Sequence, residues 1–215
     1  MIHPSTELRH IDDRIGYGVF ATAFIPRGTV IWALDAFDRV LSPGEVLALP
    51  DLLRAQVEKY AYVDAAGDFI LCWDFGRYMN HSCRPSSRSV GEAFEIAVRD
   101  IQPGEQLTCE YGTLNMTGDF ACACGAPGCR GSVSATDLDS LWGEWDREAA
   151  QAFRWALAVP QPLLPYAKLS HADQVLADAL REGRDVPLPS SRHYQAATPA
   201  GAQPPLGEGL WALGR

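Results

Sequence analysis

Three cysteines lie close together in one short segment of the chain, at Cys122, Cys124 and Cys129. Thiolates are preferred ligands of zinc, and a structural zinc ion takes four ligands in a tetrahedron. Three thiols from one segment need a distant fourth, and Cys83 is the leading candidate. Glycine and proline within residues 125–128 supply the tight turns that a metal knuckle needs. We expect one zinc ion with an architectural role, because four thiolates leave no open position for water or substrate.

Other chemistry is open to the same residues. His81 lies two residues before Cys83, which suggests a cysteine–histidine nucleophile. Such close neighbours rarely reach working geometry, and a zinc-bound thiolate is not free to attack. The clustered cysteines could instead form a redox pair or be unrelated buried thiols. Cys72 lies in an apolar run and is expected in the core.

Two glycines near the start of the chain, Gly16 and Gly18, flank Tyr17. Glycines have no Cβ atom, so the backbone can approach a ligand closely and present its amides to a carboxylate. The pair is not a dinucleotide-binding motif, because the third glycine, the following helix and the βαβ context are missing. Taken alone, the pair is weak evidence for any ligand.

Four segments, in this order, resemble the SET domain with its cysteine-rich post-SET tail, the family of lysine methyltransferases that use S-adenosylmethionine. They are Gly16 to Ala21, Arg77 to Cys83, Gly104 to Gly112 and Cys122 to Cys129. The resemblance runs from about residue 14 to residue 131 and says nothing about the rest of the chain. It implies an enzyme that transfers methyl groups to the side-chain amine of a lysine by in-line displacement.

The resemblance also implies a role for each matched residue. Tyr111 matches the active-site tyrosine, which orients the amine and the transferring methyl group. The residues expected to bind S-adenosylmethionine are Gly16, Tyr17, Gly18, Arg77, Tyr78, Asn80, His81, Tyr111 and Phe120. Those expected to line the substrate lysine channel are Tyr60, Tyr62 and Cys109. The expected ligands of one structural zinc ion are Cys83, Cys122, Cys124 and Cys129.

Two positions depart from the family. Cys109 stands two residues before Tyr111, where the family usually has Phe or Tyr, and the smaller side chain leads us to expect di- or trimethylation. Ser86 stands where the family has Asn. If these changes spoil the channel, the alternative is a catalytically weak or inactive, zinc-stabilised SET-fold module that binds peptides. Retention of Tyr111, Asn80 and His81 argues against this alternative.

The elements that must position these residues are mainly β with α additions. Short apolar runs between turns predict strands in residues 8–35, 69–73, 94–98 and 106–109. In residues 42–62 the apolar residues recur at helical spacing, which predicts one or two short helices, with Ser42 as an N-terminal cap. The resemblance implies a SET-domain, β-clip-like fold of small sheets. In that fold the Asn80 loop and the Tyr111 segment pass one another in a knot-like crossing.

The expected domain organisation has four parts. The SET domain spans residues 8–118, with 42–62 as a helical insert, and the zinc-binding post-SET motif spans 119–132. Apolar residues at helical spacing then predict a C-terminal helical extension over residues 136–183, with Ser170 capping a helix that ends at Gly183. Residues 184–215 are rich in Pro, Ser, Gly and Ala, and we expect them to be poorly ordered.

Charge and hydropathy narrow the expected partners. A formal net charge of −9 argues against direct nucleic-acid binding, which needs a basic face. An acidic surface suits a lysine-containing protein or peptide substrate, although such a balance also simply keeps a protein soluble. No apolar run approaches the roughly 20 residues that span a bilayer, and the start lacks a signal-peptide pattern. We therefore expect a cytoplasmic protein with no membrane partner.

Overall fold

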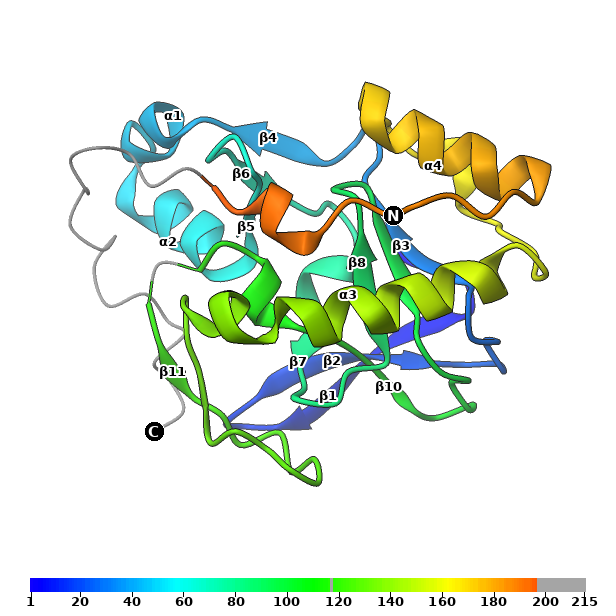
Figure 1. Ribbon diagram of the computed structural model, residues 1–215. Coiled ribbons are helices and arrows are strands. Elements are labelled where there is room, and N and C mark those ends of the chain that lie inside the picture. Colours follow the sequence, from blue (N-terminus) through cyan, green and yellow to red (C-terminus); the bar gives the residue numbers. More distant parts are fainter. Residues whose placement is uncertain (117, 197–215) are drawn as a thin grey trace.

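The computed structural model describes residues 1–116 and 118–196 of the chain. Within these ranges the strands form four small sheets, and helices lie between and around them (Figure 1). The prediction of a mainly β fold with α additions is therefore confirmed. No helix in the described ranges is both long and apolar enough to cross a membrane.

The first sheet brings three of the sequence motifs together. Its strand order is β1-β2-β10-β7, with bounds Thr6–Asp12, Gly16–Ala21, Gln106–Cys109 and Asn80–His81. β10 pairs antiparallel with β2 and parallel with β7, where Thr108 lies opposite Asn80 and Cys109 opposite His81. The two segments that were expected to cross thus lie side by side, and Tyr111 follows directly after this sheet. The crossing itself stays a prediction.

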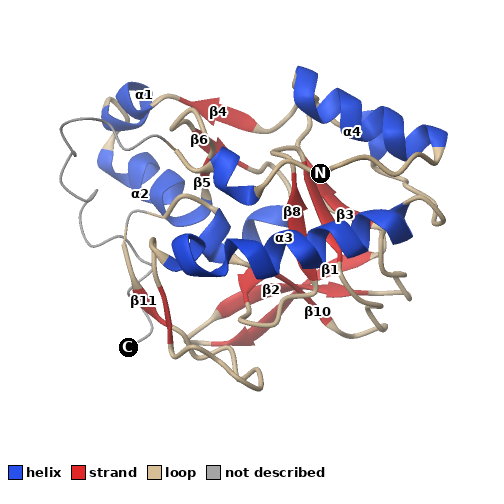
Figure 2. Cartoon of the chain, viewed as in Figure 1, coloured by secondary structure: helices blue, strands red, loops and turns tan. Residues whose placement is uncertain are grey.

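The second sheet carries the main core. Its order is β3-β9-β8, with bounds Val30–Ala33, Phe94–Ala97 and Ser87–Val90. Every residue of β3 and β9 is buried. The long helix α3 (Asp137–Ala156) lies across these strands (Figure 2), and its Phe153 packs in one cluster with Phe94 and Ala33. α4 (His171–Glu182) adds Leu176 and Leu180 to the same cluster.

The third sheet and two short helices form a smaller unit. Its order is β4-β6-β5, with bounds Arg39–Leu41, Phe69–Leu71 and Tyr62–Val63. α1 (Pro43–Leu47) and α2 (Asp51–Tyr60) pack Val46 and Val57 against Leu41 and Phe69. Ser42 caps α1 in a capping box with Glu45. These helices confirm the prediction for residues 42–62.

The remaining elements are short. β11 (Phe120–Ala121) and β12 (Ser132–Val133) pair antiparallel and enclose the cysteine loop. The 3-10 helices are η1 (Phe75–Tyr78), η2 (Tyr111–Thr113), η3 (Leu164–Tyr166) and η4 (Ser191–Tyr194). α4 begins at its predicted cap, Ser170, and ends at Gly183, whose φ is 65°.

The segment that was expected to be poorly ordered differs from that expectation in its first part. Residues 184–196 have a defined path and include η4, which packs against α3 and Asn115. Hydrogen bonds to Asp146 and Asn115 supply the contacts that composition alone does not reveal. The rest of that expectation, for residues 197–215, lies outside the described residues.

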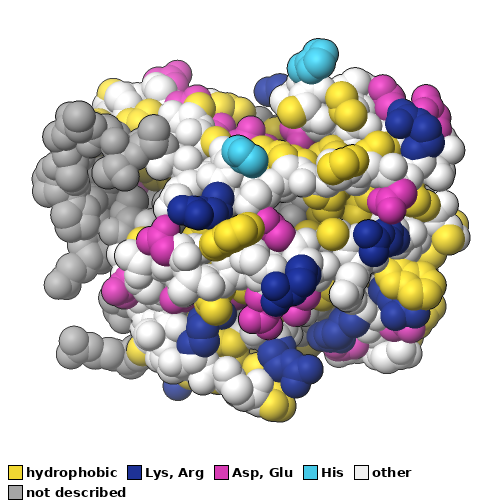
Figure 3. Space-filling model, viewed as in Figure 1, with side chains coloured by type: hydrophobic (Ala, Val, Ile, Leu, Met, Phe, Trp, Pro, Cys, Tyr) yellow, Lys and Arg dark blue, Asp and Glu magenta, His cyan; other side chains and the backbone are white. Residues whose placement is uncertain are grey.

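Charged side chains of both signs are interspersed on the face shown in Figure 3. This face combines helix α3 with neighbouring segments, as in Figure 1. A single-sign field is thus absent from this view of the described residues. The predictions of a cytoplasmic location and of no nucleic-acid binding stay predictions.

Candidate functional site

The four predicted metal ligands lie together. The sulfur atoms of Cys83, Cys122, Cys124 and Cys129 are all within 4.8 Å of one another. Cys83 Sγ is 3.8 Å from Cys122 Sγ and 3.9 Å from Cys129 Sγ. Four sulfur atoms bound to one ion at about 2.3 Å would lie about 3.8 Å apart, so the spacing fits a tetrahedral zinc site.

Backbone amides surround these sulfur atoms. Arg130 N donates to Cys83 Sγ, Cys83 N to Cys124 Sγ, and Gly131 N to Cys129 Sγ, each at 3.4 Å. Amide hydrogen bonds favour the thiolate form, which is the form that binds a metal. The turn between the second and third thiols of the loop uses glycine, with φ of 68° at Gly125. The donor set and its surroundings therefore fit one zinc ion.

Sequence reasoning missed the ion pairs that tie this loop to the Tyr111 segment. Glu110 is 1% exposed, and its two oxygens accept hydrogen bonds of 2.9 and 2.8 Å from the guanidinium of Arg130. Arg88 lies 3.7 Å from the same carboxylate, and Arg130 also reaches Asp137 of α3 at 3.0 Å. Such bidentate pairs fix orientation as well as charge. Their only sequence signal was adjacency, since Glu110 precedes Tyr111 and Arg130 follows Cys129.

Tyr111 is held at both ends. Its hydroxyl donates to the carbonyl oxygen of Met79 at 2.9 Å, and its backbone N–H donates to His81 Nδ1 at 3.3 Å. The rings of Tyr111, His81 and Phe120 form a three-way cluster with centroid distances of 5.5, 5.9 and 6.0 Å. Burial raises the pKa of the Tyr111 hydroxyl well above its usual value, so the hydroxyl stays protonated.

Both ring nitrogens of His81 contact other groups of the protein. Nδ1 accepts from Tyr111 N, and Nε2 lies 3.4 Å from Cys83 Sγ. Burial lowers the pKa of His81 to about 4, against the opposing charge of Glu110, so the ring is neutral. A cofactor contact by His81 would therefore use its backbone or the face of its ring. The contact of His81 with S-adenosylmethionine stays a prediction.

The glycine pair lies against Asn80. Asn80 Nδ2 donates to Tyr17 O at 2.9 Å, which joins β7 to the start of β2. A Cβ atom at Gly18 would lie 2.5 Å from Gln106 Nε2 and 3.0 Å from Asn80 Nδ2, so side-chain ends from β10 and β7 crowd this position. Gly16 has a φ of 80°, which glycine adopts readily. These residues form a compact face next to Tyr111.

Aromatic rings continue from this face towards the helical insert. The Tyr17 ring lies 5.9 Å from that of Tyr78, and the Tyr78 ring lies 5.3 Å from that of Tyr60. Both contacts are edge-to-face, the arrangement that aromatic pairs favour. The predicted cofactor residues are thus connected to a residue predicted to line the lysine channel.

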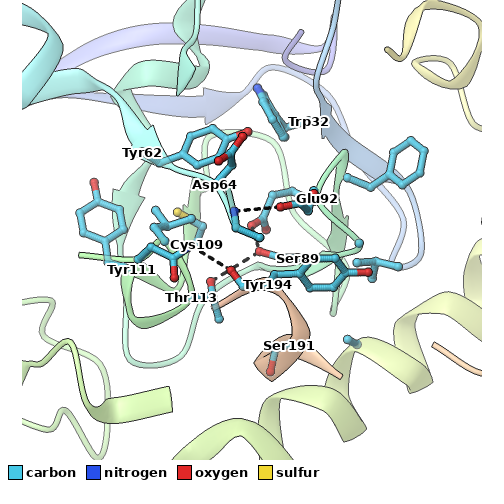
Figure 4. Close-up of a pocket in the computed structure, with 18 of the residues that line it drawn as sticks. Trp32, Tyr62, Asp64, Ser89, Glu92, Cys109, Tyr111, Thr113, Ser191 and Tyr194 are labelled. Atoms are coloured by element: carbon cyan, nitrogen blue, oxygen red, sulfur yellow. Dashed lines mark hydrogen bonds between the residues drawn. The ribbon is translucent and has the colours of Figure 1, made fainter. Parts of the chain in front are cut away.

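A cavity of about 570 Å³ has Tyr111 in its lining (Figure 4). All three residues predicted for the lysine channel, Tyr60, Tyr62 and Cys109, line it together with Tyr111. Arg77, expected at the cofactor, lines it as well. Burial raises the pKa of the Cys109 thiol, so this side chain is a small neutral group in the wall.

The site therefore has two sides that share Tyr111. The glycine pair, Asn80, His81 and Phe120 are absent from the described lining of the cavity, whereas the predicted channel residues are part of it. The cavity also contains residues that sequence reasoning did not assign to a site. They include Ser89, Glu92, Glu95, Thr113, Trp142, Asp146, Ser191 and Tyr194. No motif marks them, because several come from α3 and η4, far along the chain.

The amino-acid sequence of this chain is similar to those of known proteins. Residues 16–112 match the family model described as the SET domain. The chain is 26% identical over 149 residues to an H3 lysine-36 specific histone-lysine N-methyltransferase of Cryptococcus neoformans, covering 61% of this chain and 17% of the relative. It is 29% identical over 145 residues to the histone-lysine N-methyltransferase Set2 of Drosophila melanogaster, covering 61% of this chain and 6% of the relative. The chain thus spans a small part of these relatives.

A solved structure is also similar. It is the crystal structure of KRYPTONITE in complex with mCHG DNA and SAH, with 24% sequence identity and a TM-score of 0.42. The match covers 60% of this chain and 28% of that chain.

Proposed function

Because this chain is a SET-domain protein, with the domain matched over residues 16–112, we propose that it is a protein-lysine N-methyltransferase that uses S-adenosylmethionine. The Cryptococcus and Drosophila relatives described above are named histone-lysine N-methyltransferases. The observation that carries the proposal is the position of Tyr111 between two faces. One face holds the glycine pair with Asn80, and the other is the cavity with Tyr60, Tyr62 and Cys109.

Methyl transfer to an amine is an in-line displacement, in which the carbon–nitrogen bond forms as the carbon–sulfur bond breaks. The enzyme must align the two reactants and admit a neutral amine. A free lysine has a pKa of about 10.4, and burial beside aromatic rings and a cationic sulfonium favours its neutral form. The Tyr111 hydroxyl donates its proton to Met79 O, so the lone pairs of the hydroxyl oxygen stay available to accept a hydrogen bond. It can therefore accept a hydrogen bond from the amine and orient it.

S-adenosylmethionine would bind on the glycine side. Backbone amides near Gly16 and Gly18 would face its carboxylate, with Asn80 and the ring of Phe120 as further walls. Bound there, it supplies the methyl group. Tyr17, Tyr78 and Arg77 complete the proposed set around η1 and β2. The carbonyl of Tyr17 is already held by Asn80, so this face is organised before a ligand arrives.

Zinc would act on structure alone. We assign Cys83, Cys122, Cys124 and Cys129 as its ligands and residues 119–132 as a post-SET motif, with the SET domain over 8–118. The ion would hold β11, and with it Phe120, against Tyr111 and His81. The helical extension over 136–183 would complete the chain's organisation.

The size of the Cys109 side chain affects how many methyl groups the site can add to one lysine. Its side chain is small and lies in the cavity wall near Tyr111, where a bulkier group would limit space. We infer that the site accepts a mono- or dimethylated lysine and continues to di- or trimethylation. Mass spectrometry of peptide products tests this, and products that stop at one methyl group under excess enzyme and cofactor would contradict it.

The decisive experiment uses tritiated S-adenosylmethionine, zinc-loaded protein and a panel of basic proteins. Wild type should transfer label, and Tyr111→Phe and Cys129→Ser should both abolish transfer. Tyr166→Phe is the matched control, because Tyr166 is 61% exposed and lies outside the cavity lining. Measurable cofactor binding without transfer to any substrate would instead favour the peptide-binding module.

A further inference from the structure

The cavity beside Tyr111 extends beyond the residues of the lysine channel. It reaches α3 and η4, both of which follow the segment that matches the SET domain. Its volume of about 570 Å³ lies within the range of about 300–1,000 Å³ in which pockets hold whole small ligands. The cavity therefore has room for more than one side chain.

Segments near the end of the described chain form its outer wall. Asp146 Oδ1 on α3 accepts a hydrogen bond of 2.9 Å from Ser191 N. Asn115 Nδ2 donates to Tyr194 O at 2.9 Å, and Asn115 Oδ1 accepts from Ala196 N at 2.8 Å. Ser191 and Tyr194 line the cavity together with Thr113 and Ser89 (Figure 4). These contacts fix η4 as a structured part of the cavity.

Four carboxylates line this cavity: Asp64, Glu92, Glu95 and Asp146. None of the four forms an ion pair with a residue in the described ranges. Glu110 behaves differently, since it is buried and paired with Arg130. The protein thus neutralises one buried carboxylate and leaves the cavity carboxylates without a direct cationic partner.

Glu95 is the most deeply placed of the four. It is 5% exposed, and its Oε1 accepts a hydrogen bond of 2.7 Å from Ser89 Oγ. Its Oε2 is buried without a hydrogen-bond partner among the described residues, and so is Ser191 Oγ in the same cavity. Leaving buried polar atoms unpaired is unfavourable, so a ligand that donates to them gains this pairing.

Three basic residues also line the cavity, and none of them forms an ion pair with the four carboxylates in the described structure. The Arg77 guanidinium donates to the carbonyl oxygens of Trp73 and Asp74 at 2.9 and 3.3 Å. Lys59 Nζ lies 5.1 Å from the ring centroid of Tyr60. Arg147 is the third base in the lining. None of these three cations contacts the four carboxylates within ion-pair distance in the described structure.

We propose that this cavity selects a peptide that carries a second cationic side chain, best an arginine, next to the target lysine, with Glu95, Glu92 and Asp146 as its recognition residues. The inference rests on the proposed lysine methylation. Tyr111 and Cys109 contact the target lysine, while the second side chain enters the branch between β9, α3 and η4. Arginine fits best because its planar group has several donors, which can reach carboxylates and the Ser191 hydroxyl together.

The test compares peptides that differ only in charge. Each contains one lysine, and each neighbouring position carries arginine, its uncharged isostere citrulline, or glutamate in turn. The zinc-loaded full chain should methylate the best arginine peptide with a kcat/KM about tenfold above its citrulline match, the effect expected of a charge-assisted hydrogen bond. Glu92→Gln and Asp146→Asn should each reduce this ratio towards one. Glu95→Gln should do so as well if it folds.

Glu182→Gln is the matched control, because Glu182 is exposed on α4 and should leave the ratio unchanged. Equal kcat/KM for arginine and citrulline peptides at every position would overturn the inference and leave the proposed methyl transfer intact. If no peptide is methylated, fluorescence anisotropy decides separately. Tighter binding of arginine peptides that Glu92→Gln removes would support the cation site without catalysis, and equal binding would refute it.

Discussion

Glu110 and Glu95 are both buried acids of the same domain, yet their surroundings differ. Glu110, 1% exposed, receives two hydrogen bonds from Arg130 and has Arg88 nearby. Glu95, 5% exposed, receives one from Ser89 and keeps an oxygen without a described partner. A buried charge is stable only when it is paired, so the first glutamate serves the fold and the second is suited to a ligand.

The same contrast separates the two sides of the site. On the zinc side, thiols, backbone amides and the Glu110–Arg130 pair satisfy one another. On the cavity side, four carboxylates face an open volume. The zinc side should therefore respond to mutation mainly through structure, and the cavity side mainly through binding.

Zinc removal should have the largest effect. We expect a chelator to abolish methyl transfer, because Phe120 loses its place beside Tyr111, and to increase amide hydrogen exchange across residues 119–133. The β3-β9-β8 sheet should keep its protection, since its core with α3 contains none of the thiols. Added zinc should restore both readouts. Unchanged exchange in residues 119–133 after verified metal loss would contradict the assignment.

Glu110→Gln should destabilise the protein far more than Glu95→Gln. Removing one partner of a buried ion pair costs about 3–5 kcal/mol, because Arg130 and Arg88 would lose their shared carboxylate. The second change should alter the free energy of unfolding by less than about 1 kcal/mol, because Glu95 has no ion-pair partner in the described structure to lose and glutamine can still accept the hydrogen bond from Ser89. Urea unfolding of both variants measures the difference. Equal losses would show that the two glutamates are structurally equivalent.

Gly18→Ala should have an intermediate effect, confined to the cofactor side. The new Cβ would press on Gln106 and Asn80, whose side-chain ends can move, so the free energy of unfolding should fall by only about 1 kcal/mol. Displacement of Asn80 should weaken S-adenosylmethionine binding by about tenfold in calorimetry. Gly44→Ala is the control, since nothing lies within 4 Å of its Cβ position. Unchanged affinity would remove Gly18 from the proposed site.

Glu92→Gln should have the smallest effect on stability, and the effect should depend on pH. Burial raises the pKa of Glu92, and the charges of Asp64 and Asp173 add to this. The folded state therefore binds the proton more tightly, so wild-type stability falls as pH rises from the usual carboxyl pKa through the raised one. At neutral pH the variant should be more stable by less than about 1 kcal/mol, and the gain should vanish in acid. A gain that persists in acid would point to another cause.

The sequence predicted much of the fold because its signals are local. The Ser42 and Ser170 caps, the Gly183 stop and the helices of residues 42–62 depend on neighbouring residues, and each is present in the structure. The four predicted thiols also come together, three from one segment and Cys83 from a distant one. Predictions from local signals were therefore confirmed for these caps and helices.

The rest depends on tertiary contacts that no spacing reveals. The Glu110–Arg130 pair, the lining by Asp146 and Ser191, and the ordered path of residues 184–196 all join distant segments. The ring nitrogens of His81 show the same limit, since their contacts with Cys83 and Tyr111 have no signal in the sequence. The sequence shows that these residues are polar, but the contact partner of each polar group depends on the tertiary structure.

The pairing of β2 with β10 sets the order in which the nascent chain can acquire its site. Phe20 lies opposite Gln106, and in the neighbouring sheet Val30 lies opposite Ile96. During synthesis the glycine strand must therefore wait, with one edge unpaired, until most of the domain has left the ribosome. Folds dominated by such distant pairing form in milliseconds to seconds rather than microseconds. Until Tyr111 reaches its place, the unpaired edge of β2 can pair with another chain, which makes this stage of folding prone to aggregation.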